Sequence, residues 1–402
     1  DREQLVLREH GARSETATER ERTDVTHEDL RGVRVVPKEA DAGADHRGAE
    51  HGQLAHLVDA GDVQVRREVP AERQAPIPAR LEPFYAVEAH SMLELEPPRH
   101  TRLRGLVLRA FTSRRIAALA PEIATLSHQL VDAFPDGPFD LLKAFATRLP
   151  VTIIARLLGV PEDRGDDLLA WSNAMVGMYQ ASRTRATEDR AAQAAASFSA
   201  FLAAHVESRR DRPGDDLITH LIAAEAEGER LSTDELISTC ILLLNAGHEA
   251  TVHTIGNGVK ALIERRTPPA ALAPDQVGAT VEEILRHDPP LHLFTRWAYE
   301  DAEISGHTFR RGDRVGLLLA AANRDPALWD EPDRFDPARP VKPNHSFGAG
   351  LHFCVGAPLA RLEMQIALPI LFARCPRLAL AEPPRYANLY HFHGLERLMV
   401  RA

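Results

Sequence analysis

The chain has 402 residues, 44% of them hydrophobic, which is enough to fill a large core, and a formal net charge of −10. The acidic balance excludes a general nucleic-acid binder, and three widely separated cysteines exclude a disulfide framework and a Cys-x-x-Cys zinc site. No uncharged apolar run reaches the roughly 18–20 residues that cross a bilayer, and no signal peptide opens the chain, so we expect a cytoplasmic protein without membrane contact.

Residues 1–80 differ in composition from the rest of the chain. None of the 14 Phe, 5 Tyr and 3 Trp residues occurs before Phe84, and residues 1–80 carry 17 acidic and 13 basic side chains. Such a segment buries little surface, which predicts a disordered, weakly helical or divergent region. A charged surface lobe that packs on the rest is the alternative. We therefore predict an atypical segment, residues 1–80, and one folded domain, residues 81–402.

From Leu81 onwards the apolar pattern is mainly helical. A long helix is predicted between a capping box, Ser232 to Glu235, and a stop at Thr267-Pro268-Pro269; its roughly 33 residues would extend about 50 Å. Strand signals are few, and the clearest covers residues 302–317. The sequence thus predicts a mainly α fold with small β-sheets. The other predicted helices are 115–133, 140–158, 164–180, 187–209 and 214–226.

Cys354 differs from the other two cysteines in its surroundings. It has glycines on both sides, and Pro358 follows where a first helical turn tolerates proline. The thiol is therefore expected just before a helix N-terminus, where backbone N–H groups and the helix dipole favour a thiolate. This arrangement predicts a metal-binding thiolate, whereas Cys240 and Cys375 fit buried small hydrophobic residues.

The segment around this cysteine resembles the haem-binding signature of the cytochrome P450 family, Phe-x-x-Gly-x-(His/Arg)-x-Cys-x-Gly. Every fixed position is matched, by Phe347, Gly350, His352, Cys354 and Gly356. The resemblance implies the cytochrome P450 fold, with the long helix over the haem, and haem b with Cys354 as its axial iron ligand. It also implies cofactor contacts at Phe347 and Gly348. The implied cationic partners of the two haem propionates are His100, Arg104, Arg296 and His352.

A second motif, Glu283-Ile-Leu-Arg286, is similar to the family's Glu-x-x-Arg helix, in which an acid–base pair locks a buried core. The resemblance implies a third member of this network, and the sequence leaves Arg334 and Arg339 as alternatives. The spacing alone is not specific, because it recurs at Glu19–Arg22, Glu207–Arg210 and Glu331–Arg334.

The long helix carries Ala246-Gly247-His248-Glu249-Ala250-Thr251, which resembles the family's (Ala/Gly)-Gly-x-(Asp/Glu)-Thr-Thr pattern on the oxygen-binding face. The resemblance implies that Gly247 lets O2 approach the helix and that Glu249 relays protons. The family's first threonine is replaced by Ala250, and only the second, Thr251, is present. A substrate hydroxyl or water that replaces the missing group, uncoupled turnover, and peroxide as oxidant are the alternatives; we favour the first.

The resemblance implies a monooxygenase that inserts one atom of O2 into a small to medium, largely hydrophobic organic substrate. We recognise no flavin or nicotinamide domain in the sequence, so electrons from NAD(P)H are expected to reach a monomeric enzyme through separate chains, a ferredoxin and its reductase. A haem-thiolate peroxygenase or oxidative coupling enzyme, and a non-catalytic haem-binding or sensing protein, are the alternatives. Candidate donor-facing cations are Arg102, Arg109, Arg114, Arg115 and Arg361.

Overall fold

The computed structural model describes residues 33–35, 65–180, 183–226, 229–304, 306–388 and 392–402. Its α-helices are α2 (Glu82–Glu88), α3 (Arg99–Ala110), α4 (Ser113–Ala118), α5 (Ala120–Asp132), α6 (Arg148–Leu158), α7 (Gly165–Val176), α8 (Arg185–Asp211), α9 (Leu217–Ala223), α10 (Thr233–Glu264), α11 (Val277–His287), α12 (Leu319–Ala322) and α13 (Ala357–Arg374). Its strands are β1 (Val33–Val35), β2 (Val65–Arg66), β3 (Phe139–Asp140), β4 (Glu225–Ala226), β5 (Glu229–Arg230), β6 (Leu293–Ala298), β7 (Ala302–Ile304), β8 (His307–Phe309), β9 (Arg314–Leu318), β10 (Ala379–Leu380), β11 (Arg385–Tyr386), β12 (Leu395–Arg397) and β13 (Met399–Arg401).

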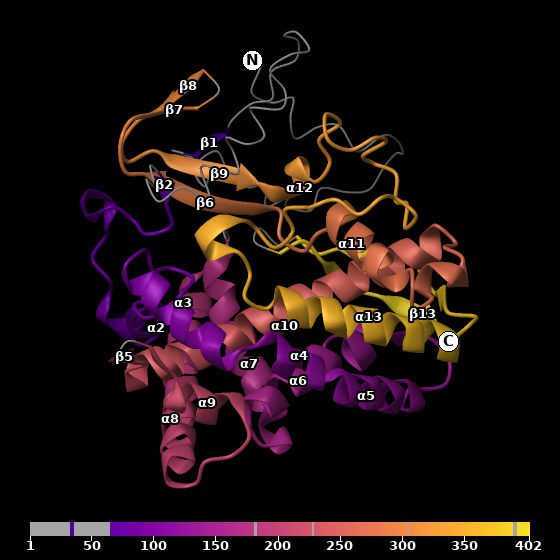
Figure 1. The fold of residues 1–402 in the computed structure, drawn as a ribbon, viewed down its shortest axis with the longest axis horizontal. Coiled ribbons are helices and arrows are strands. Elements are labelled where there is room, and N and C mark those ends of the chain that lie inside the picture. Colours follow the sequence, from indigo (N-terminus) through magenta and orange to yellow (C-terminus); the bar gives the residue numbers. More distant parts are fainter. Residues whose placement is uncertain (1–32, 36–64, 181–182, 227–228, 305, 389–391) are drawn as a thin grey trace. The chain divides into compact units, whose positions relative to one another are not determined.

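Helix α10 confirms the prediction of a long helix and organises the helical part of the fold (Figure 1). It begins at the predicted capping box, in which Ser232 and Glu235 each bond the other's backbone N–H. Leucine, isoleucine and valine side chains along its length are buried against α6, α8, α11 and α13. Gly258 permits the closest approach to α11, because a Cβ there would lie 2.9 Å from Cγ2 of Ile284.

Several other predicted helices have different bounds. The predicted helix 115–133 is two helices, α4 and α5, separated at Leu119, because Pro121 suits only a first helical turn. The segment 140–158 begins with the end of β3 and a π-helix, Leu142–Ala146, before α6 starts. Likewise 214–226 contains α9 followed by β4. The segments 164–180 and 187–209 correspond to α7 and α8.

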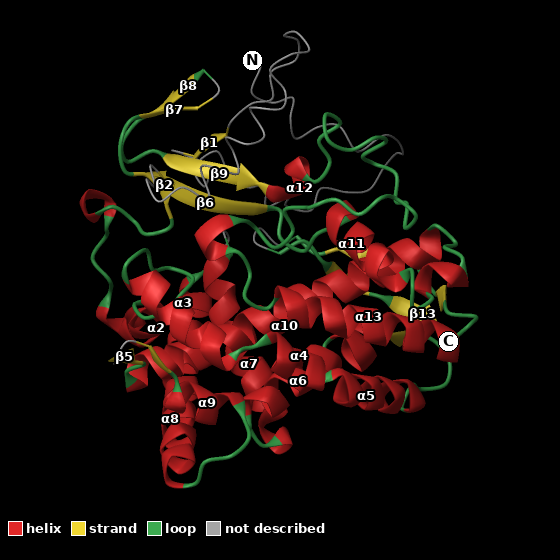
Figure 2. Cartoon of the chain, viewed as in Figure 1, coloured by secondary structure: helices red, strands yellow, loops and turns green. Residues whose placement is uncertain are grey.

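The largest sheet has the strand order β1-β9-β6-β2 and lies apart from most of the helices (Figure 2). Strand β1 runs parallel to β9, and the other neighbours are antiparallel. The strand signal over 302–317, which glycine turns interrupt, corresponds to a hairpin, β7 and β8, followed by β9. Besides the β7-β8 hairpin, the smaller sheets are β10-β13-β3, β11-β12 and β4-β5.

Part of the segment predicted to be atypical belongs to the described fold. The described residues from Val33 onwards belong to one compact unit, in which β1 and β2 pair with β9 and β6 of the large sheet. The backbone N–H of Arg67 donates to Oε1 of Glu96 at 2.6 Å. Described structure therefore begins before the boundary at residue 80, while residues 1–32 and 36–64 lie outside the described residues. Among the helices described, none is long and apolar enough to span a membrane.

Candidate functional site

Cys354 lies on a tight loop immediately before α13, as predicted. Its backbone N–H donates to the Phe347 carbonyl at 3.0 Å, which closes the loop. Gly348 and Gly350 have φ angles of +69° and +66°, in the left-handed region that favours glycine. The Phe347 ring packs under the Arg361 guanidinium, 4.5 Å from its centroid. The motif glycines and Phe347 thus shape the loop that presents the sulfur.

The protonation of the Cys354 thiol is governed by two opposing effects. Burial raises its pKa, while N–H groups of Gly356 and Ala357 and the charges of Arg104 and Arg361 act to lower it. The start of α13 therefore lowers the pKa of the thiol, as predicted, but burial raises it by more. A bound metal cation supplies the positive charge that a buried thiolate needs.

His100 and His352 lie together beside the cysteine loop. Their ring centroids are 4.3 Å apart, and Nε2 of His352 lies 3.3 Å from Oε1 of Glu96. His100 is 1% exposed, yet neither ring nitrogen has a hydrogen-bond partner among the described residues. Burial, and then the charges of His352 and Arg104, lower the pKa of His100 to about 4. His100 is therefore a buried imidazole with two unused polar atoms.

The two predicted arginines have different surroundings. Arg104 on α3 donates to the Phe353 carbonyl at 2.6 Å and so braces the cysteine loop. Arg296 on β6 is half-buried, and its only hydrogen bond among the described residues is to the carbonyl of Thr295, at 3.0 Å. Burial, and then the charge of Arg67, lower the pKa of Arg296 to about 10. Each guanidinium thus makes one hydrogen bond to a backbone carbonyl among the described residues, which leaves further N–H groups of both for a ligand.

The Glu283–Arg286 pair is the buried ion pair that the second motif predicts. Arg286 is 1% exposed and donates from Nε and Nη2 to both oxygens of Glu283, at 2.7 and 2.8 Å. Arg339 is the third member, because its Nε lies 3.5 Å from Oε2 of Glu283. Arg334 contributes its backbone carbonyl to Arg286, and its side chain pairs with Glu331 at the surface.

The α10 motif brings a carboxylate and two imidazoles together. Oε1 of Glu249 lies 3.6 Å from Nε2 of His248, and Oε2 lies 3.5 Å from Nε2 of His253. Burial acts to raise the pKa of Glu249, but hydrogen bonds and charges from the two histidines hold it at about 2. Thr251 donates to the Gly247 carbonyl at 3.1 Å, so its hydroxyl is engaged within the helix beside Ala250.

Two residues near the predicted site were missed by sequence reasoning. His253 stands four positions after Glu249 on the same helix, and this spacing could have identified it. Glu96 meets His352 across more than two hundred residues, and no local signal indicates that contact.

The predicted donor-facing arginines divide into two groups. Arg102, Arg115 and Arg361 make ion pairs or backbone hydrogen bonds. Arg109 and Arg114 are exposed and make no ion pair or side-chain hydrogen bond within the described ranges. Leu108 and Phe353 are 46% and 37% exposed, so apolar side chains also reach the surface near this end of α3.

Comparison with known proteins shows the family. The cytochrome P450 family model matches residues 277–379. Cytochrome P450 monooxygenase PikC from Streptomyces venezuelae is 40% identical over 322 residues, which cover 78% of this chain and 76% of the relative. Vitamin D(3) 25-hydroxylase from Pseudonocardia autotrophica is 42% identical over 321 residues, covering 79% and 76%. The structure of P450BioI in complex with hexadec-9Z-enoic acid ligated acyl carrier protein matches with a TM-score of 0.81 and 35% identity, covering 87% of this chain and 90% of that one.

The chain belongs to the cytochrome P450 family. Its relatives are named monooxygenases or hydroxylases, and it is accordingly a cytochrome P450 monooxygenase of the haem-thiolate, O2-using type. The comparisons confirm the predicted family, fold class and type of enzyme.

Proposed function

We propose that this enzyme holds haem b on Cys354 and hydroxylates a small to medium, largely hydrophobic substrate with electrons from a separate ferredoxin and reductase. The observation that carries the proposal is the Cys354 loop beside His100, a buried imidazole whose ring nitrogens have no hydrogen-bond partner among the described residues. The test is turnover of the purified enzyme with NAD(P)H, ferredoxin and reductase under ¹⁸O2, which should place one labelled atom in the product. Label-free turnover driven only by peroxide would favour a peroxygenase instead.

The residues present fit an iron porphyrin. Cys354 offers one thiol at the start of α13. His100 has two unsatisfied nitrogens, and Arg296 is a half-buried cation whose carboxylate partner is not supplied by the described protein. Propionates would complete both, because buried donors and charges need partners. His352, already paired with Glu96, and Arg104, which braces the loop, would contribute positive charge from further away.

We expect haem-free protein to lose stability as the pH falls from about 6.5 to 4, in part through His100. The unfolded state, in which the imidazole has its ordinary pKa of 6.5, binds the proton first, whereas burial lowers the pKa in the folded state to about 4. The difference corresponds to at most about 3 kcal/mol. Urea unfolding at a series of pH values should give a shallower slope for His100→Phe.

Haem provides the control for this pH dependence. A propionate partner would raise the pKa of His100, so the slope in the wild-type holoenzyme should also be shallower than in the haem-free protein. A slope that neither His100→Phe nor haem alters would contradict the assignment.

The bound haem supplies O2 reduction by two electrons and two protons, with insertion of one oxygen atom into the substrate and release of the other as water. The protein's task on the α10 side is to bring protons to that oxygen. Glu249, with His248 and His253 on either side of its carboxylate, is the group on this side to which we assign proton relay. Ala250 offers no hydroxyl there, and Thr251 already donates to its own helix. A substrate hydroxyl or ordered water would supply the missing link.

Ala250→Thr tests this role of the substrate. Product formed per NAD(P)H should increase several-fold with substrates that lack a hydroxyl, and change little with substrates that carry one near the oxidised carbon. The measurement is product against cofactor consumed, with hydrogen peroxide release recorded in parallel. If coupling is unchanged for every substrate, proton delivery does not depend on this position.

Electron delivery is proposed to use the exposed cations near the cysteine loop. Arg109 and Leu108 on α3 and Arg114 on α4 are exposed, as is Phe353 of the cysteine loop. Helix α3 lies beside that loop, because its Arg104 donates to the Phe353 carbonyl. Apolar side chains rimmed by cations suit a small acidic protein such as a ferredoxin.

Charge reversal tests this surface. Arg114→Glu should raise the KM for ferredoxin about three- to tenfold at low salt, because like charges then meet at the rim of the complex. Peroxide-driven turnover should be unchanged, since it bypasses the donor. Arg190→Glu on α8 reverses the same charge at another exposed site and serves as the control. An equal KM in both variants would place the docking surface elsewhere.

A further inference from the structure

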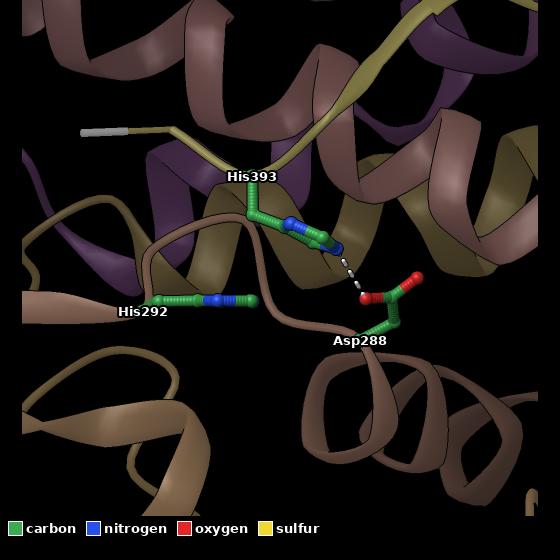
Figure 3. A group of neighbouring side chains, drawn as sticks. All are labelled: Asp288, His292 and His393. Carbon is green, nitrogen blue, oxygen red and sulfur yellow. Dashed lines mark ion pairs between the residues drawn. The ribbon is translucent and has the colours of Figure 1, made fainter. Parts of the chain in front are cut away.

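Asp288, His292 and His393 bring three metal-ligating side chains together outside the residues assigned to haem (Figure 3). Asp288 follows α11, His292 precedes β6, and His393 precedes β12. One ligand atom from each residue lies within 4.8 Å of those of the other two. Within the described part of the chain this is the only such group of three.

The carboxylate of Asp288 is held in place from two sides. The Tyr386 hydroxyl donates to its Oδ2, and Nε2 of His393 lies 3.0 Å from its Oδ1. Asn257 on α10 fixes the backbone, because its amide donates to the carbonyls of Asp288 and His393 at 3.2 and 3.1 Å. One carboxylate oxygen is thus anchored by a neighbour, and the other faces a histidine, as in metal sites whose outer partners orient the ligands.

His292 supplies a ring nitrogen to the group and lies against the ring of His393. The backbone of Pro289, which has no N–H, takes part in a hydrogen bond with it, so one ring nitrogen carries the proton and the other keeps its lone pair. The His292 ring stacks on His393 with centroids 4.1 Å apart and an interplanar angle of 26°.

We propose that Asp288, His292 and His393 bind one divalent transition-metal ion, of which Zn²⁺ is the probe we choose. Two imidazole nitrogens and one carboxylate oxygen are a donor set used by zinc and related ions, with further positions left for water. The 3.0 Å between Oδ1 and Nε2 equals the span of two ligands at about 2.1 Å from a shared ion with an angle near 90°.

Binding requires two local changes. Nε2 of His393 must offer its lone pair to the ion, so any proton on that nitrogen has to move to Nδ1 or leave. Imidazole coordinates in its ring plane, so the stacked rings of His292 and His393 must also tilt apart toward the carboxylate. The ion would then join the end of α11, the start of β6 and the turn before β12, segments now held by hydrogen bonds and stacking.

The test is a Zn²⁺ titration of untagged, chelator-treated holoenzyme by calorimetry, with the metal content measured after gel filtration. We expect one ion per chain, and at least about 100-fold weaker binding in His292→Ala and in His393→Ala. Tyr386→Phe keeps all three ligands but frees the carboxylate, and should weaken binding about tenfold. Bound Zn²⁺ should raise the Tm of the wild type but not of His292→Ala.

His220→Ala is the matched control. His220 Nε2 lies 3.0 Å from Oδ1 of Asp215, the same pair distance, but no third ligand joins this pair among the described residues. This variant should bind Zn²⁺ as the wild type does. Unchanged haem absorption identifies folded variants, and if His393→Ala does not fold, His292→Ala decides alone. Absence of a stoichiometric ion in the wild type, or full affinity in folded His292→Ala, overturns the proposal.

Discussion

Replacing Cys354 with serine should remove the red-shifted carbonmonoxy band of the reduced enzyme and lower monooxygenase turnover to background. A thiolate pushes electron density onto iron and favours O–O cleavage, and a serine hydroxyl remains protonated and cannot do this. The measurement is the carbonmonoxy difference spectrum of the reduced protein, followed by product formation with the full electron-transfer chain. Haem content should be measured too, because the variant also loses the iron ligand.

Cys375→Ser is the matched control for this result. Cys375 lies at the C-terminal end of α13, where the helix dipole disfavours a thiolate and no N–H groups of a helix start face the sulfur, so it should not bind iron. The control should keep the red-shifted band and full turnover. A wild-type spectrum in Cys354→Ser, or loss of the band in Cys375→Ser, would contradict Cys354 as the ligand.

Local sequence signals predicted the elements whose own residues determine them, and not those that need a distant partner. Helix α10 has its capping box and a sustained apolar period, so both its existence and its start were predictable. Strand β3 was not, because its two residues pair with Met399 and Val400, far along the chain. Without that partner Asp140 looks like the start of the predicted helix 140–158, since a short apolar segment fits either pattern.

The difference between local and distant signals also explains which parts of the candidate site were predictable. The cysteine loop was predictable because glycines and proline act on their own backbone. The pairing of Glu283 with Arg339 rather than Arg334 was not predictable. Both arginines follow similar acidic turns, and only the folded path of the chain brings Arg339 to Glu283 while Arg334 pairs with Glu331. The Asp288–His292–His393 group depends on a contact between segments about a hundred residues apart, and no spacing rule reaches that far.

The Glu283–Arg286 pair gives the largest stability effect that we expect. Glu283→Ala should destabilise the holoenzyme by about 3–5 kcal/mol and promote loss of haem, because it leaves a buried guanidinium without its counter-charge. Arg286 is 1% exposed, and although backbone carbonyls of Asn323 and Pro332 also accept its N–H groups, they carry no full charge. The measurement is denaturant unfolding monitored by far-ultraviolet circular dichroism and by haem absorbance.

Glu207→Ala tests whether the loss of stability comes from the burial of the ion pair or from the Glu-x-x-Arg spacing itself. Glu207 and Arg210 have the same Glu-x-x-Arg spacing and form an ion pair of 3.5 Å, but their side chains are 62% and 41% exposed. Water and salt screen such a pair, so the substitution should cost no more than about 0.5 kcal/mol. If the two variants lost similar stability, the spacing itself would carry the effect. A large difference assigns it to the desolvated network that Glu283 forms with Arg286 and Arg339.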